Sequence, residues 1–184
     1  LRLRPPACVG SSLPPALARL GAFAGGAPSP GGAARRAEAS GQPDSVLFAE
    51  WGAGLVALTR GDADEAVRVF DRLLALCRAH DLDAYVSRSM AGLGLAKARA
   101  GQVAEGLALL EQAVTLDASA EPRLTHTLAL NALAEASFRA GELGKALTAV
   151  SEALRHARAR EERVAEAYGC WILALIRAAG DGDP

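Results

Sequence analysis

The sequence predicts an all-α chain of about seven helices, arranged as antiparallel pairs that stack in one dimension. Three observations support this class: a motif that recurs every forty residues, a composition suited to closely packed helices, and the confinement of most prolines to the first 44 residues. Folds of this class usually present a surface to another molecule and leave catalysis to other domains. The sequence therefore predicts an interaction protein and not an enzyme.

The recurring motif is centred on Gly61, Gly101 and Gly141. Each glycine is preceded at seven positions by a small residue, and followed at five by another small residue and at nine by a bulky apolar one. These positions are Gly54, Gly94 and Ala134; Ala66, Gly106 and Ala146; and Phe70, Leu110 and Val150. Small residues allow two helices to approach closely, and glycine adopts a left-handed turn conformation at little cost.

Composition and charge narrow the class of function. Apolar residues make up 51% of the chain but aromatic residues only 4%, so the core must consist mainly of Ala, Leu and Val. The net charge of −1 gives no general attraction to nucleic acid or to acidic membranes. Cys8, Cys77 and Cys170 are far apart in sequence, which disfavours a disulfide framework or a zinc site and favours a reducing cytoplasm.

The chain divides at about residue 44. Residues 1–44 carry seven of the nine prolines, so we expect a disordered tail rich in Pro, Gly, Ala and Arg, and no signal or transit peptide. The remainder, 45–184, is expected to be one repeat domain. Its expected repeats are 45–83, 84–120, 121–161 and a truncated 162–184. Because Leu1 is not Met and the last repeat is cut short, we expect a fragment of a longer protein.

Helical periodicity and turn residues divide the repeat domain into individual helices. The expected helices are 45–60, 63–79, 84–100, 103–116, 121–140, 143–159 and 162–179. The first, third and fifth helices end at the recurring glycines, which suit a helix C-terminus. The second, fourth and sixth begin just after them, where acidic residues favour the positive end of the helix.

Other helix signals lie between the pairs and near the end. Asp81 or Asp83 can cap the third helix, and Pro122 fits the first turn of the fifth, where no N–H donor is needed. The last helix contains an apolar run of ten residues, Ala167–Ile176. That run is too short to span a bilayer, so no membrane contact is expected. Apolar residues surround nearly the whole helix, and 162–179 is therefore the expected surface for self-association.

The small–Gly–small–bulky spacing over residues 45–179 resembles the tetratricopeptide repeat. Its period exceeds the usual length of about thirty-four residues and is similar to the longer helices of MalT-like bacterial regulators. The resemblance implies a right-handed α-solenoid in which the first helix of each pair lines the concave face. That face would bind a protein, a peptide or another domain of the parent chain.

A second resemblance covers Glu152 to Tyr168, which is similar to the C-terminal repeat region of large bacterial signalling proteins. Those proteins join an adenylate/guanylate cyclase-like or a LuxR-type DNA-binding domain to a nucleotide-binding module. The resemblance implies a scaffold or sensor module of a larger bacterial signalling or transcriptional regulator. Two alternatives stay open: the regulatory repeat region of a cyclase- or ATPase-containing enzyme, and a small-effector-binding sensor. The chain contains no phosphate-binding loop.

By the tetratricopeptide resemblance, candidate partner-binding residues lie on the first helix of each pair. They are Phe48, Trp51, Leu55, Arg88, Arg99, Asn131, Glu135, Phe138, Arg139, Tyr168 and Trp171. Aromatic side chains and arginine dominate interface energetics, and arginine can clamp a carboxylate. In the alternative interpretation, the tryptophans close the two ends of the stack and the arginines pair with local acids such as Glu135.

No catalytic, cofactor or metal site is expected. His80, His126 and His156 fall in three different elements, with no Asp or Cys at ligand spacing. Nucleic-acid contact is not expected either, because neither the net charge nor interleaved aromatics support it.

Overall fold

The computed structural model describes residues 43–118 and 124–180. Within these residues the backbone forms α-helices and no strand, which confirms the predicted all-α class. The helices are α3 (Pro43–Arg60), α4 (Ala63–Ala79), α5 (Asp83–Arg99), α6 (Val103–Ala118), α7 (Leu124–Arg139), α8 (Leu143–Ala159) and α9 (Arg163–Gly180). Helix α3 starts at its proline, which suits a first helical position. The rest of the predicted tail and Pro122 lie outside the described residues.

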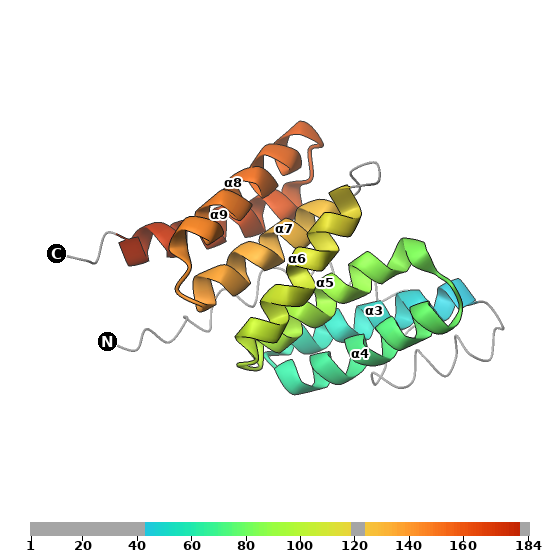
Figure 1. Ribbon diagram of the computed structural model, residues 1–184. Helices are drawn as coiled ribbons and strands as arrows, with labels where there is room; N and C mark the ends of the chain where they lie inside the picture. Colours follow the sequence, from blue (N-terminus) through green and yellow to red (C-terminus); the bar gives the residue numbers. More distant parts are fainter. Residues whose placement is uncertain (1–42, 119–123, 181–184) are drawn as a thin grey trace.

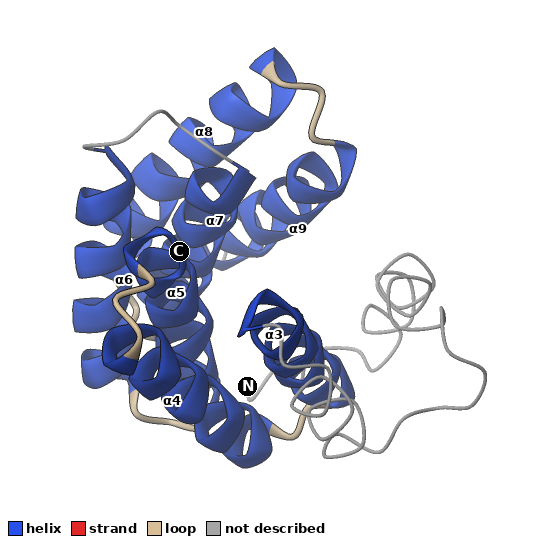
Figure 2. Ribbon diagram, turned by 90° about the vertical axis from the view of Figure 1, so that its right-hand side faces the viewer, coloured by secondary structure: helices blue, strands red, loops and turns tan. Residues whose placement is uncertain are grey.

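The helices stack in sequence order along one direction (Figure 1). Helices α3 and α4, α5 and α6, and α7 and α8 form antiparallel pairs, and α9 packs against α7 and α8. The first helices of the pairs also pack on one another, α3 on α5, α5 on α7 and α7 on α9. Figure 2 shows the resulting arc, with α4, α6 and α8 on its outer side. We call the surface formed by α3, α5, α7 and α9 the inner face.

The turn within each pair closes on the recurring glycine, as predicted. Gly61, Gly101 and Gly141 all have positive φ, at 80°, 91° and 79°. In the first turn the N–H of Gly61 donates to the carbonyl of Leu58 and that of Asp62 to the carbonyl of Ala57. The same pair of bonds recurs at the other two glycines. This is the Schellman ending, which satisfies carbonyls left open at a helix C-terminus.

The predicted cap of α5 is wrong. Its N-cap position is Leu82, and no side chain makes a capping hydrogen bond there. Asp81 instead adopts the left-handed conformation, with φ 53°, and the N–H of Leu82 donates to the carbonyl of Cys77. The aspartate thus takes the place that glycine has in the turns within the pairs, because aspartate tolerates this conformation better than most residues. Glu161 holds the same position, with φ 58°, in the turn between α8 and α9. Asp83 is the first residue of the helix and lies in its first turn.

Phe70 of α4 links the first two pairs. Its side chain is fully buried, and its ring contacts glycines of both α3 and α5. A Cβ atom added at Gly54 would lie 2.5 Å from the ring, and one added at Gly92 would lie 2.6 Å from it. The prediction that small residues permit close packing is confirmed here, and also where a Cβ on Gly106 would lie 2.5 Å from the carbonyl oxygen of Gly94.

Helix α9 packs one of its apolar faces against α7 and α8. The buried residues of that face are Ala165, Gly169, Ile172 and Ile176. Trp171 and Leu173 are partly buried against the core. Self-association through 162–179 stays a prediction, and Ile172 is not available to it, because its side chain is 0% exposed. Among the described helices, none is long and apolar enough to cross a membrane.

Candidate interaction surface on the inner face

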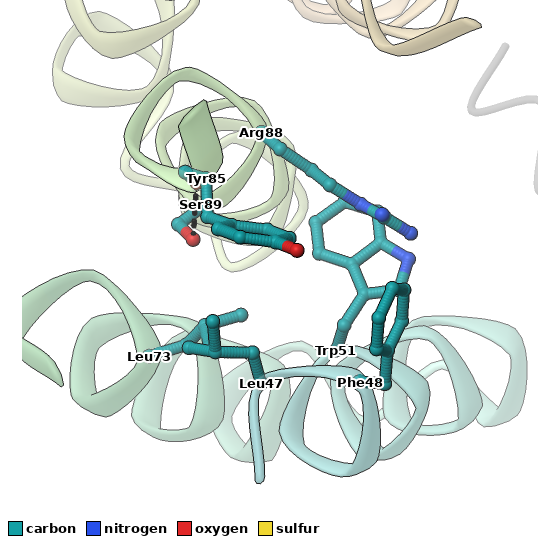
Figure 3. A pocket seen from close by; sticks show the side chains of 7 residues that line it. All are labelled: Leu47, Phe48, Trp51, Leu73, Tyr85, Arg88 and Ser89. Atoms are coloured by element: carbon teal, nitrogen blue, oxygen red, sulfur yellow. Dashed lines mark hydrogen bonds between the residues drawn. The ribbon is translucent and has the colours of Figure 1, made fainter. Parts of the chain in front are cut away.

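At the α3 end of the inner face, an arginine lies against aromatic rings (Figure 3). The guanidinium carbon of Arg88, on α5, is 4.2 Å from the centroid of the Trp51 ring and 5.8 Å from that of Phe48. A cation over an aromatic face is attracted by the ring quadrupole, most strongly by tryptophan. Tyr85 approaches Phe48 edge-on, with ring centroids 6.3 Å apart. We call Phe48, Trp51, Tyr85 and Arg88 the aromatic–arginine cluster.

The charge of Arg88 is not matched by a nearby acid. Arg88 forms no ion pair with any described residue, and its Nε is buried without a hydrogen-bond partner. Burial lowers the pKa of Arg88 from its usual value. A guanidinium offers donors in a fork that fits a carboxylate. The cluster therefore presents a cation that is held in place by stacking and can still accept an anionic partner group.

A small open pocket lies between α3, α4 and α5 at this cluster. Its lining combines the cluster with three further side chains (Figure 3): Leu47, Leu73 and Ser89. The two leucines are buried and form an apolar wall. Phe48 is 56% exposed, which is unusual for a ring of its size and places an apolar edge beside the pocket.

A second group of polar side chains connects all four helices of the inner face. Arg99 of α5 binds the Glu135 carboxylate of α7 twice, Nε to Oε1 at 2.8 Å and Nη2 to Oε2 at 2.7 Å. Arg139 donates from Nε to the same Oε1 at 3.0 Å, and the Tyr168 hydroxyl of α9 donates to Oε2. Arg99 also donates from Nη1 to the carbonyl of Leu58 on α3, at 3.3 Å. We call Arg99, Glu135, Arg139 and Tyr168 the carboxylate network.

The carboxylate network keeps Glu135 ionised although the side chain is only 2% exposed. Burial alone raises the pKa of Glu135, but the charges and hydrogen bonds of Arg99, Arg139 and Tyr168 outweigh it and lower the pKa overall. Burial and the neighbouring Glu135 charge raise the pKa of Tyr168, so its hydroxyl stays a neutral donor. Both carboxylate oxygens are occupied, and the group therefore acts as a structural tie rather than as an acid or base.

Comparison with solved structures identifies the architecture. The chain is similar to a crystal structure of TPR-like repeats of a putative kinesin light chain from Podospora anserina, with a TM-score of 0.50 and 17% sequence identity. The match covers 91% of this chain and 94% of that chain. The chain has a TPR-like fold. No protein-family model and no curated protein matches the sequence. At 17% sequence identity, the structural similarity establishes the fold but not the function.

The TPR-like stack brings most of the predicted inner-face residues into two groups, the aromatic–arginine cluster and the carboxylate network. Trp171 extends the second group by stacking on Tyr168, with ring centroids 5.7 Å apart and planes 14° apart. Leu55 and Phe138 are partly buried and pack against the core. Asn131 is 0% exposed and donates to the carbonyl of Ala165 at 2.9 Å, which ties α7 to α9.

Two features of the site escaped sequence reasoning. Tyr85 was not singled out, although it lies one helical turn before Arg88 and so shares its face. The expected pairing of Glu135 with Arg139 is confirmed, but the bidentate pair with Arg99 was missed. The sequence does contain a sign of this pair. Arg99 and Glu135 are 36 residues apart, which is the forty-residue period minus one helical turn, and this separation places their side chains on adjacent first helices.

Proposed function

We propose that this chain is a protein-interaction module whose inner face binds a peptide segment bearing an acidic group. TPR-like repeats generally mediate contacts between proteins, which supports the class of function. The observation that supports the site is the aromatic–arginine cluster, where Arg88 has no acidic partner among the described residues. In this proposal a partner carboxylate pairs with Arg88, and an apolar partner side chain lies against Phe48.

The chemistry of the cluster favours this kind of partner. Tryptophan, tyrosine and arginine supply most of the energy of protein interfaces. Stacking on Trp51 restricts the Arg88 side chain before any partner arrives, so less conformational entropy is lost on binding. The carboxylate network fixes the spacing of the helices of the inner face and so preserves the shape of the surface. A carboxylate that neutralises Arg88 in this partly desolvated position gains more than it would at an open surface.

Peptide selection tests the proposal directly. Peptides are selected from a displayed random library against the wild-type chain, and their affinities are then measured for Arg88→Ala and Trp51→Ala. The matched control is Arg68→Ala, which removes the same charge from an exposed position on α4, outside the inner face. We expect selected peptides to contain acidic residues and to bind Arg88→Ala at least about tenfold more weakly. Equal losses for Arg88→Ala and Arg68→Ala would refute the site.

We also propose that the module belongs to a larger bacterial signalling or transcriptional regulator of MalT-like type and works in the cytoplasm. The resemblance of Glu152 to Tyr168 to such regulators supports the context. The free thiols of Cys77 and the exposed Cys170 support a reducing compartment. Sequencing the coding region on both sides of this chain tests which larger protein it belongs to. A LuxR-type helix-turn-helix supports a transcriptional regulator, whereas a cyclase domain with a phosphate loop supports the regulatory region of an enzyme.

A further inference from the structure

Two histidines and a glutamate meet where α7 packs on α8, away from the aromatic–arginine cluster. His126 lies near the start of α7, and Glu152 and His156 lie one helical turn apart on α8. One potential ligand atom from each residue lies within 4.8 Å of those of the other two. The imidazole rings meet edge to face, with centroids 5.3 Å apart. The antiparallel pairing of α7 with α8 creates this group from residues up to 30 positions apart in sequence.

The buried histidine of this group lacks a partner. His126 is only 5% exposed, and its Nδ1 is buried without a hydrogen bond to any described residue. An unsatisfied polar atom in a protein interior is costly and uncommon, and such atoms often bind a water molecule or an ion. His126 takes no part in the aromatic–arginine cluster or in the carboxylate network. A ligand that accepts electron pairs from both histidines would satisfy the unpartnered nitrogen of its ring.

The second histidine offers a lone pair. The Nη2 of Arg155 lies 3.0 Å from Nε2 of His156. A guanidinium can only donate, so Nε2 must be the unprotonated nitrogen in this arrangement. The nearest carboxylate oxygen, Oε1 of Glu152, is 3.8 Å from Nε2. A neutral imidazole beside a carboxylate is the form in which these groups bind a metal ion.

We propose that His126, Glu152 and His156 form a binding site for a divalent transition-metal ion, with zinc as the best match. Two imidazoles and one carboxylate are a known zinc donor set that leaves a fourth position for water or another ligand. Calcium and magnesium prefer sets made of oxygen alone, so they fit this site poorly. The proposal departs from the sequence-based expectation of no metal site, because that expectation rested on linear spacing.

The ligand atoms must move closer together to hold zinc. Metal–ligand bonds of about 2.0–2.2 Å require the three atoms to approach one another more closely than they do here. The Glu152 side chain is 46% exposed and that of Arg155 66% exposed, so both can move without disturbing the core. Arg155 would leave Nε2 of His156 and turn toward solvent. A bound ion would then tie the start of α7 to the second half of α8.

Zinc titration of the untagged chain tests the site. Cys8→Ser and Cys170→Ser form the background, so that these thiols do not bind the metal. The probe is zinc chloride, measured by calorimetry and by thermal unfolding with and without a chelator. We expect one zinc ion per chain and a rise in Tm that the chelator reverses, because a ligand of the native state stabilises it. Glu152→Gln and His156→Gln should each weaken binding about tenfold or more.

Two further variants serve as controls for the zinc titration. His80→Gln removes the third histidine, which is exposed at the end of α4, and should leave zinc affinity unchanged. Arg155→Ala removes a competing positive charge and should raise the affinity. Zinc affinity that is the same in wild type, Glu152→Gln and His156→Gln would overturn the proposal, as would no shift in Tm at millimolar zinc. Because Glu152 is exposed, its variant decides the matter even if a histidine variant unfolds.

Discussion

Arg99 and Glu135 form a two-pronged ion pair between adjacent first helices, with N–O distances of 2.8 Å and 2.7 Å. The pair joins α5 to α7, and the Glu135 side chain is only 2% exposed. Paired charges in such a position stabilise little in net terms, but leaving one of them unpaired is costly. The ion pair with Arg99 therefore explains why the buried Glu135 is ionised. It also explains why we expect loss of the Glu135 carboxylate to destabilise the inner face.

Glu135→Gln should strongly destabilise the chain. The substitution leaves Arg99 and Arg139 close together with no carboxylate between them, and we expect a loss of about 3 kcal/mol in the free energy of unfolding. Urea denaturation followed by circular dichroism measures it. The control is Glu111→Gln, which breaks an exposed pair with Lys145 and should cost less than about 1 kcal/mol. Equal losses in the two variants would contradict the role of the network.

The pH dependence of stability should follow Glu135. Its pKa in the folded chain lies below the usual value of 4.5, so ionised Glu135 stabilises the fold above that pH. This contribution is lost as the pH falls from about 4.5 through the lower folded pKa. We expect the free energy of unfolding to fall more steeply over this range in wild type than in Glu135→Gln. Parallel pH profiles for the two proteins would show that Glu135 is not the group responsible.

Tyr168→Phe tests the Tyr168 hydroxyl by removing it from the carboxylate network. The ring stays stacked on Trp171, but Glu135 loses one donor, and hydrogen bonds to charged groups contribute about 2 kcal/mol. Thermal and urea unfolding should both show the loss. Tyr85→Phe is the matched control, because the Tyr85 hydroxyl makes no hydrogen bond with the described residues; we expect a change within about 0.5 kcal/mol. A neutral Tyr168→Phe would mean that water replaces the donor.

Gly54→Ala should disturb the packing of Phe70. The new Cβ would lie 2.5 Å from the ring, so the helices must move apart or the ring must shift, at a cost of about 1–3 kcal/mol. Gly52→Ala lies two residues away in α3 with nothing within 4 Å, and should be neutral or stabilising. Unfolding curves of the two variants test the contrast. Phe70→Leu, combined with Gly54→Ala, should recover part of the loss if the ring is the obstacle.

The sequence predicts the helices well because the turns depend on local chemistry. Gly61, Gly101 and Gly141 adopt the left-handed conformation that glycine favours, and each helix that they end finishes within one residue of its expected position. The turn before α5 was predicted less well. There Asp81 takes the left-handed position, and sequence alone does not distinguish that role from a side-chain cap.

The candidate sites were only partly predictable, because they depend on contacts between helices. The resemblance placed Arg88 and Trp51 on one face, but not the stacking of one on the other. The separation of His126 from His156 matches no local spacing rule, since the antiparallel pair brings them together. Likewise Asn131, predicted to meet a partner, lies in the interior, where it ties α7 to α9. Sequence periodicity gives the helix face, whereas depth of burial depends on the neighbouring pair.

The most direct test of the proposed function is the footprint of a bound peptide. An isotopically labelled chain is titrated with a selected acidic peptide, and the NMR shifts of its backbone amides and tryptophan indole N–H groups are followed. The account predicts that the changes centre on α3 and α5 around Trp51 and Arg88, and that Arg88→Ala abolishes them. Changes confined to the outer helices α4, α6 and α8 would contradict the inner face as the binding surface.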